Sequence, residues 1–330
     1  MRRLLMAALA TALLGGTAVA KDFHPAVIYD TGGKFDKSFN EAAYNGAERF
    51  KKETGIAFRE FEIQNESQRE QAMRNLARKG ATIIVAVGFS QAAAVAKVAK
   101  EFPKVEFTLI DDVVELPNVQ SVLFKEHEGS FLVGVLAGLA SKTGKVGFVG
   151  GMDIPLIRKF ECGYAQGVKY AKPDAQVFEN MTGTTPAAWN DPTKGGELAK
   201  SQFDRGADVV YAAAGGTGVG VYQAAKDNGK LAIGVDSNQN YLQPGTMLTS
   251  MMKRVDLAVY NAFMSAKNGT WKAGVTSLGL AEDGVGWALD DNNKALITAD
   301  MKTKVDQAKQ DIISGKIKVV DYTAAKSCPD

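Results

Sequence analysis

Three acidic residues stand at the carboxyl ends of apolar runs that we expect to be buried strands: Asp30, Asp111 and Asp236. Three further runs of this kind end in glycine, at positions 88, 150–151 and 215–216. Ligands of parallel α/β sheets bind outside the carboxyl ends of the strands, so we expect these groups to line one cleft. Carboxylates in such a cleft would accept hydrogen bonds from a polar molecule, although each is also a common turn or cap residue.

Two aromatic residues are predicted at helix starts on the same side of the fold. Phe39 follows Ser38, and Ser38 with Glu41 has the spacing of a capping box, which opens a helix. Trp189 stands two residues before Asp191, a favourable N-cap residue that is followed by proline. Two rings that face one cleft from different halves of the chain would clamp a flat molecule, although Phe39 could instead pack on its own helix.

Two weaker signals accompany these residues. Lys253 lies in a mostly apolar run behind Asp236, where it would either pair with that aspartate or be an ordinary solvated lysine. The glycine-rich stretch 215–220 lacks the spacing of a dinucleotide-binding loop and the lysine of an ATP-binding loop. It is typical of a tight turn, and backbone N–H groups around Gly216 could contact a polar ligand at the helix start that follows.

The sequence offers little for catalysis. Its two histidines are His24 and His127, and a Ser-His-Asp triad would have to use His127 near a predicted helix start. The two cysteines, Cys162 and Cys328, are too far apart in the sequence for a zinc-ligand spacing. We therefore expect a binding protein with no cofactor and no metal rather than an enzyme.

Apolar runs rich in β-forming residues alternate with segments of helical periodicity along nearly the whole chain. This alternation predicts mainly parallel sheets covered by helices on both faces, and two such series, at about 24–125 and 145–250, predict an α/β fold with two doubly wound lobes. The expected strands are 26–30, 58–63, 82–87, 105–111, 119–124, 145–150, 175–181, 209–214 and 231–236. The expected helices are 38–53, 68–79, 91–102, 154–170, 192–205 and 219–228, with a buried apolar helix at 129–140.

The chain is expected to contain a leader, two lobes and a tail. Residues 1–20 have the charged, apolar and small-residue parts of a secretory signal peptide, and the apolar part is too short to span a membrane. We assign 21–127 with about 253–278 to an N-terminal lobe and 128–252 with about 279–322 to a C-terminal lobe. The segments 255–267 and 275–290 would cross back to complete the lobes, and 323–330 form a C-terminal tail.

The predicted leader sets the expected location. No cysteine stands near the predicted cleavage site, so the sequence predicts a free, unlipidated periplasmic protein without a membrane anchor. In that oxidising compartment Cys162 and Cys328 could form a structural disulfide. The 39 basic side chains less Arg2 and Arg3 leave 37, against 37 acidic ones, and no block of lysine or arginine indicates a nucleic-acid partner.

Six blocks of the sequence together resemble one family. They are residues 36–40 (DKSFN), 124–134 (FKEHEGSFLVG), 149–155 (VGGMDIP), 215–218 (GGTG), 234–237 (GVDS) and 249–256 (TSMMKRVD). They strongly resemble the basic-membrane-protein family of ABC-transporter substrate-binding proteins, of the purine-nucleoside-receptor type. The resemblance runs over about residues 24–322. It implies a type I periplasmic binding protein whose two lobes close on a purine nucleoside, such as adenosine, guanosine or inosine.

The resemblance also implies roles for the residues described above. Phe39 and Trp189 would stack on the two faces of the base, with Trp189 in place of the family's usual phenylalanine. Asp30 and Asp111 would meet the edge of the base, although Thr31 after Asp30 could change how that edge is read. The ribose hydroxyls would be held by two further side chains with one backbone neighbour: Asp236, Lys253 and Gly216.

The resemblance implies an ABC-transporter permease with its ATPase as partner, and we expect a monomer because a carrier must dock with that partner. Many family members are lipoproteins, so the missing lipid-bearing cysteine is a departure from the family. Alternatives on the same scaffold are a free purine base, a flavin or a sugar as ligand. An alternative of another class is a periplasmic nucleoside hydrolase.

Overall fold

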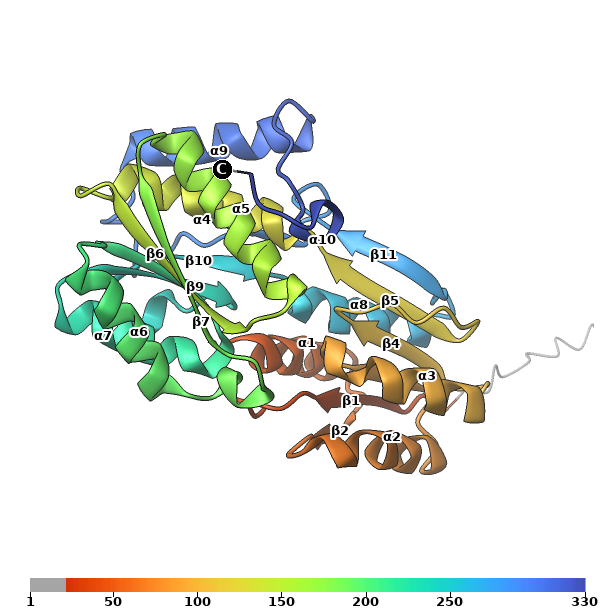
Figure 1. Ribbon diagram of the computed structural model, residues 1–330. Coiled ribbons are helices and arrows are strands. Elements are labelled where there is room, and N and C mark those ends of the chain that lie inside the picture. The colour runs from red at the N-terminus through yellow and green to blue at the C-terminus, as the bar shows by residue number, and fades with distance from the viewer. Residues whose placement is uncertain (1–21, 330) are drawn as a thin grey trace, which may run out of the picture.

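The computed structural model describes residues 22–329, so the predicted signal peptide at 1–20 lies outside the described residues. Within that range the chain forms two six-stranded sheets with helices on both faces (Figure 1). The first sheet is parallel, in the order β11-β5-β4-β3-β1-β2. Its strands are β1 (Pro25–Tyr29), β2 (Arg59–Glu62), β3 (Ile83–Ala86), β4 (Glu106–Ile110), β5 (Val119–Phe124) and β11 (Gly274–Leu278).

The second sheet has the order β12-β10-β9-β8-β6-β7. Only its edge strand β12 runs antiparallel, against β10. The strands are β6 (Lys145–Met152), β7 (Gln176–Gly183), β8 (Val209–Ala213), β9 (Leu231–Asp236), β10 (Met247–Lys253) and β12 (Val285–Trp287). The predicted fold class, two doubly wound α/β lobes with mainly parallel sheets, is confirmed.

Helices cover both faces of each sheet. Around the first sheet α1 packs on α8 and α2 on α3; around the second, α4 packs on α5 and α9, and α6 on α7. The helices are α1 (Phe39–Thr54), α2 (Arg69–Arg78), α3 (Ala92–Glu101), α4 (Glu126–Ala140), α5 (Pro155–Ala171), α6 (Pro192–Asp204), α7 (Gly218–Asp227), α8 (Val255–Lys267), α9 (Ala299–Ile313) and α10 (Tyr322–Ala325).

Burial explains why the central strands are apolar throughout. Every residue of β1, β3 and β8 is buried, as expected for parallel strands with helices on both sides. The edge strands β2 and β11 are mostly exposed and carry more polar residues. An edge strand has only one neighbour, so it gains little from a continuous apolar run.

The chain crosses between the two sheets three times. It passes from β5 into α4, from β10 into α8, and from β11 into β12. The crossing segments are hydrogen-bonded to one another: Lys125 N donates to Leu278 O at 2.9 Å, and Arg254 N donates to Gly284 O at 2.9 Å. We keep the lobe boundaries given above as a proposal that fits this sheet membership.

The expected strands and helices form with ends close to their predicted positions, but two predictions need correction. Residues 247–253, which we did not expect as a strand, form β10. The predicted capping box at Ser38 and Glu41 is wrong, because Asp36 caps α1 instead. The Asp36 carboxylate accepts hydrogen bonds from the backbone N–H groups of Ser38, Asn40 and Glu41 at 2.8, 3.0 and 3.1 Å.

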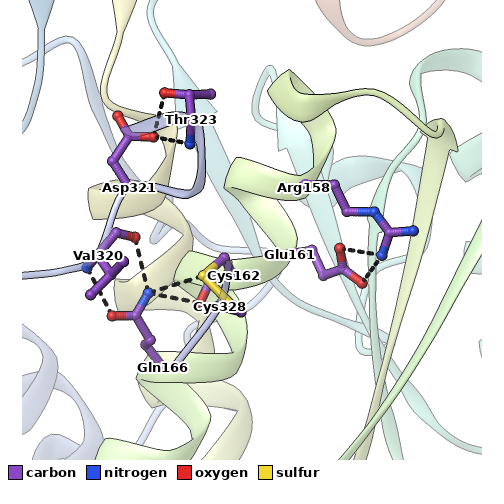
Figure 2. Close-up of a disulfide and its surroundings, with 8 residues drawn as sticks. All are labelled: Arg158, Glu161, Cys162, Gln166, Val320, Asp321, Thr323 and Cys328. Carbon is purple, nitrogen blue, oxygen red and sulfur yellow. Dashed lines mark hydrogen bonds and ion pairs between the residues drawn. A yellow bond between two sulfur atoms is a disulfide. The ribbon is translucent and has the colours of Figure 1, made fainter. Parts of the chain in front are cut away.

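A disulfide joins Cys162 on α5 to Cys328 in the C-terminal tail, with the two Cα atoms 5.4 Å apart (Figure 2). The same face of α5 holds the segment just before the tail through Gln166, whose side-chain amide exchanges two hydrogen bonds with the backbone of Val320, at 2.8 and 3.1 Å. The chain then forms the short helix α10, capped by Asp321. The C-terminal end of the chain is therefore fastened to α5 both before and after α10.

We predict that replacing Cys162 and Cys328 together by alanine lowers the free energy of unfolding by about 2–5 kcal/mol, because the bond closes a long loop in the unfolded chain. Urea denaturation without reductant measures this loss. Adding reductant should move the wild type to the midpoint of the double variant and leave the double variant unchanged. Equal midpoints for the two unreduced proteins would show that the tether contributes nothing.

Candidate functional site

A cavity lies between the two sheets, where the carboxyl ends of the strands face one another. It is lined by residues of both lobes, among them Asp30, Thr31, Asp36, Phe39, Asn40, Gly88, Phe89, Asp111, Leu156, Ile157, Phe160, Trp189, Gly215, Asp236 and Lys253. Seven of the eight side chains or turns that we predicted as ligand-binding therefore meet in one place. The exception is Gly216, which does not line the cavity.

The correction at Gly216 has a local cause. The turn η4 (Gly215–Thr217) begins at Gly215, which has φ +58° and faces the cavity. Gly216 is buried one step further on, next to the backbone carbonyl of Trp189. The backbone group that the turn presents to the cavity is therefore the first glycine of the pair.

A wider surface groove lies elsewhere, between α5 and the start of β6 and β7. It carries three lysines, but each ammonium already donates to a backbone carbonyl: Lys145 to Arg205 O, Lys169 to Pro173 O and Lys172 to Ser141 O. None of the three strand-end aspartates, Asp30, Asp111 and Asp236, lines this groove. We therefore place the candidate site in the cavity between the lobes.

Asp30 is fixed at the rim of the first lobe by a set of donors. One oxygen, Oδ1, accepts from the backbone N–H of Thr31 at 2.8 Å and from Arg69 at 3.3 Å. The other, Oδ2, accepts from Ser90 Oγ at 2.6 Å. The backbone of Asp30 is held by Asn40, whose amide oxygen accepts its N–H at 3.0 Å and whose amide nitrogen donates to its carbonyl. The carboxylate therefore has one orientation.

The two aromatic residues come from opposite lobes. Phe39 is the first residue of α1, and Trp189 is the last residue of the turn η3 (Pro186–Trp189). The indole of Trp189 lies against Gly151, where an added Cβ would collide with the ring carbon Cζ3. Only glycine at 151 leaves room for the indole in this position. The structure thus brings both predicted rings to the cavity wall.

The ammonium of Lys253 is a deeply buried charge of the site. It lies 2.7 Å from Asp111 Oδ2 and 2.9 Å from Glu126 Oε1, and not beside Asp236 or in solvent as the sequence suggested. Three rings surround it, with Nζ 5.2, 5.1 and 5.6 Å from the centres of Phe39, Phe124 and Phe160. Such contacts favour a cation.

The ionisation of this cluster follows from its burial and its pairing. Burial alone would lower the pKa of Lys253, but Asp111 and Glu126 outweigh burial and raise that pKa above its ordinary value. Burial opposes the charge on Glu126, yet Lys253 and Lys159 lower the pKa of this carboxyl. Burial raises the pKa of Asp111, although Lys253 opposes that shift. The Lys253 ammonium is therefore charged at neutral pH.

Hydrogen bonds join the two lobes directly across the cleft. Ser38 Oγ donates to Asp236 Oδ2 at 2.5 Å, and Ser237 Oγ donates to the carbonyl of Ser38 at 2.9 Å. Gln239 Nε2 donates to the carbonyl of Lys37 at 2.9 Å. The hydroxyl group of Ser38 therefore joins the lobes in the closed arrangement and does not cap its own helix.

Two of the strand-end aspartates have a strained backbone. Asp111 has φ +74° and Asp236 has φ +63°, in the left-handed region that residues other than glycine rarely adopt. Such strain persists only where the surroundings enforce it, and it gathers at functional sites. The hydrogen bond from Lys253 holds Asp111 in this conformation, and the hydrogen bond from Ser38 holds Asp236.

Sequence reasoning missed several residues of the site. Asn40 and Asp36 stand in the quoted block 36–40, so their place in the sequence was a usable signal. Glu126 forms an ion pair with Lys253, and Arg69 forms one with Asp30. Phe160 projects from the middle of α5, where an apolar residue looks like ordinary core. Glu126 also stands in a quoted block, 124–134, whereas no local pattern distinguishes Arg69 and Phe160.

The described residues 22–329 contain no group of three or more histidine, cysteine or acidic side chains that could hold a metal ion. In the same range, no helix is both long enough and apolar enough to cross a membrane.

The family model for Bmp, the PnrA-like substrate-binding proteins of ABC transporters, matches residues 23–323. The chain belongs to this family. It is an ABC-transporter substrate-binding protein, as the sequence blocks suggested, and its relatives are substrate-binding proteins rather than enzymes.

Individual relatives agree with this assignment. An ABC transporter nucleoside-binding protein, BmpA, of Lactococcus lactis is 33% identical and covers 91% of this chain and 90% of its own. A crystal structure of an ABC-transporter solute-binding protein from Aeropyrum pernix is 32% identical, with a TM-score of 0.83 over 91% of this chain and 94% of that chain. Both lobes are therefore shared with a solved member of this class.

The comparisons contradict one prediction. A relative from Pyrococcus abyssi, 38% identical over 87% of this chain and 75% of its own, is named an uncharacterized lipoprotein, and relatives from two other Pyrococcus species carry the same description. The prediction of an unlipidated periplasmic protein without an anchor is wrong by this comparison. It rested on one local feature, the absence of a cysteine near residue 20, which lies outside the described residues.

We predict that Lys253→Met lowers the free energy of unfolding by about 3–5 kcal/mol at neutral pH, because it leaves Asp111 buried and unpaired and leaves Glu126 with Lys159 as its remaining partner. Without Lys253 the folded-state pKa of Asp111 rises further above its unfolded value. The deficit relative to wild type should therefore shrink as the pH falls toward about 4.5, where Asp111 takes up a proton. Urea denaturation at both pH values measures this.

The matched control is Lys37→Met. Lys37 lies at the same cleft but its side chain is 41% exposed, so this variant should stay within about 0.5 kcal/mol of wild type. A Lys253→Met deficit that does not depend on pH would contradict the assignment of a charged cluster.

Proposed function

We propose that this substrate-binding protein captures a purine nucleoside between its two lobes and delivers it to the permease and ATPase of an ABC importer. Adenosine, guanosine and inosine are the candidate ligands. The observation that carries the proposal is the meeting of Phe39 and Trp189, from opposite lobes, in one cavity that also holds three strand-end carboxylates. The name of the Lactococcus lactis relative, a nucleoside-binding protein, supports it.

The base is assigned to the aromatic residues and to two carboxylates. Phe39 and Trp189 would stack on its two faces, and Asp30 and Asp111 would accept hydrogen bonds from its edge. Asp111 is suited to this role because its Oδ1 is buried and has no hydrogen-bond partner among the described residues. A buried acceptor without a partner is costly, so a donor on the ligand would remove that cost. Thr31 also lines the cavity and would stand beside the same edge of the base.

The ribose is assigned to Asp236 and Lys253. A carboxylate accepts and an ammonium donates, so the pair matches hydroxyl groups, which do both. The backbone neighbour that we assign to the sugar is Gly215, in place of Gly216.

The expected affinity follows from these contacts. Stacking is worth about 1–3 kcal/mol per base and a hydrogen bond to a charged group about 1.5–3 kcal/mol. Two rings and several charged groups would leave, after the cost of association, a dissociation constant below about 1 μM.

The first experiment is mass spectrometry on the small molecule released by denaturing freshly purified protein. Calorimetric titration with adenosine, guanosine, inosine, adenine and ribose follows on the ligand-free protein. A purine nucleoside that is released and rebinds tightly, with ribose inert, supports the proposal. A free base, a flavin or a sugar would overturn the ligand and leave the transport class standing. Conversion of the nucleoside on long incubation would indicate a hydrolase.

We predict that Phe39→Ala and Trp189→Ala each weaken nucleosides and free bases alike, by about 5- to 150-fold, which corresponds to the 1–3 kcal/mol of a lost stacking contact. Calorimetric titration of each variant with adenosine and adenine measures this. The control is Tyr170→Ala, since Tyr170 is an exposed aromatic residue of the second lobe that lies outside the cavity. A ring variant that loses no affinity for adenine would contradict the stacking role.

We predict that Asp236→Ala weakens nucleosides more than free bases, because only the nucleoside carries ribose hydroxyls. Asp236→Ala also removes the hydrogen bond from Ser38 that joins the lobes. Ser38→Ala removes this bond and the longer one from Ser38 to the carbonyl of Val235 but keeps the Asp236 carboxylate, so it should weaken both ligand types equally and serves as the matched control. If adenine loses as much affinity as adenosine on Asp236→Ala, the ribose assignment fails.

A further inference from the structure

A chain of buried charges continues from the cavity into the second lobe. Glu126 Oε1 lies 2.9 Å from the Lys253 ammonium, and its other oxygen, Oε2, lies 2.8 Å from Lys159 Nζ. The side chains of Lys253 and Glu126 are 2% and 0% exposed, and that of Lys159 is 11% exposed. Lys253 lines the cavity but Glu126 and Lys159 do not. A ligand in the cavity therefore has no contact with either of them.

Stability does not account for this arrangement. Taking two ions out of water costs free energy that their attraction returns only in part, and apolar replacements of buried ion pairs are often neutral or stabilising. Glu126 avoids being an isolated buried charge because it is held between two ammonium groups. What the arrangement adds is a fixed position for each charge.

The geometry fixes the direction of the Lys253 ammonium. This group has three N–H donors. One is donated to Asp111 Oδ2 at 2.7 Å, Glu126 Oε1 lies 2.9 Å away as an ion-pair partner, and three aromatic rings surround the group. The donors that Asp111 does not take are available to a ligand in the cavity that Lys253 lines.

Lys159 in turn fixes Glu126. Its ammonium donates to the backbone carbonyl of Phe124, the last residue of β5, at 2.7 Å, as well as contacting the Glu126 carboxylate. Phe124 and Glu126 flank the segment in which the chain crosses from the first lobe to the second. Lys253 stands at the end of β10, where the chain crosses back. The charge chain thus holds two crossing segments in register.

We propose that Glu126 and Lys159 are positioning residues for the Lys253 ammonium, and that they set the affinity for the sugar part of the ligand without contacting it. This inference rests on the proposed function, in which Lys253 holds the ribose. Glu126 directs the ammonium and keeps it charged. Lys159 neutralises the second oxygen of Glu126, so that Glu126 does not draw Lys253 away from the cavity.

The test is calorimetric titration of the full chain and its variants with two ligand pairs, adenosine with adenine and inosine with hypoxanthine. Competition titration covers the weaker member of each pair. The variants are Glu126→Gln, Lys159→Met and the two combined. For each single variant we expect the dissociation constant of the nucleoside to rise about tenfold or more, while that of the free base changes less than about twofold.

The double variant separates positioning from simple loss of structure. If Lys159 acts through Glu126, the combined change should weaken the nucleoside no more than Glu126→Gln alone. The double variant also removes the pair together, so it leaves no unpaired ammonium at 159 and remains testable if Lys159→Met fails to fold.

The matched control is Glu161→Gln. Glu161 is a carboxyl group on α5 that is 4% exposed and lies 2.8 Å from Arg158 (Figure 2). It is not among the ion-pair partners of Lys253, which are Asp111 and Glu126. It should lower the thermal unfolding midpoint without changing the ratio of nucleoside to base affinity. An unchanged ratio in Glu126→Gln would overturn this inference while the proposed function stands. A wild-type protein that binds no nucleoside would overturn the proposed function itself, and the inference with it.

Discussion

The rest of the site depends on one buried ammonium group, that of Lys253. Asp111 reaches it from the end of β4 and Glu126 from the start of α4, while Lys253 itself ends β10. None of these three charges could be buried alone, because an unpaired ion in the interior would be too costly. Their pairing therefore ties the first lobe to both crossing segments and fixes where the cavity lies.

The contacts between the lobes are of a kind that can open and close. Across the cleft the lobes meet through hydroxyl, amide and carboxylate groups of Ser38, Gln239 and Asp236. Polar groups of this kind exchange protein partners for water at small net cost, unlike a large apolar interface. A ligand that contacts Phe39 in one lobe and Trp189 in the other favours the closed arrangement, because only there does it touch both.

The sequence predicted the repeated strand–helix order because the burial of each strand and helix leaves its own pattern of apolar residues in a short stretch of the chain. Runs such as 83–86 and 209–213 are apolar without a break, and only a strand covered on both faces needs that. The sequence pattern is less informative at the sheet edges and after residue 247. β10 mixes threonine and serine with methionine, and β11 is mostly exposed, so neither carries a clear periodic signal.

By itself the sequence determined which residue types stand at strand ends and helix starts, and hence that Asp30, Phe39 and Asp111 would share the edge of one sheet and Trp189 and Asp236 that of the other. That follows from chain direction, because parallel strands bring their carboxyl ends together. Only the tertiary structure decided the partners. Asp36 caps α1 while Ser38 bonds to Asp236, and Lys253 pairs with Asp111 and Glu126. These contacts join residues far apart in the chain, and burial selects which charges must meet, so no local pattern could have specified them.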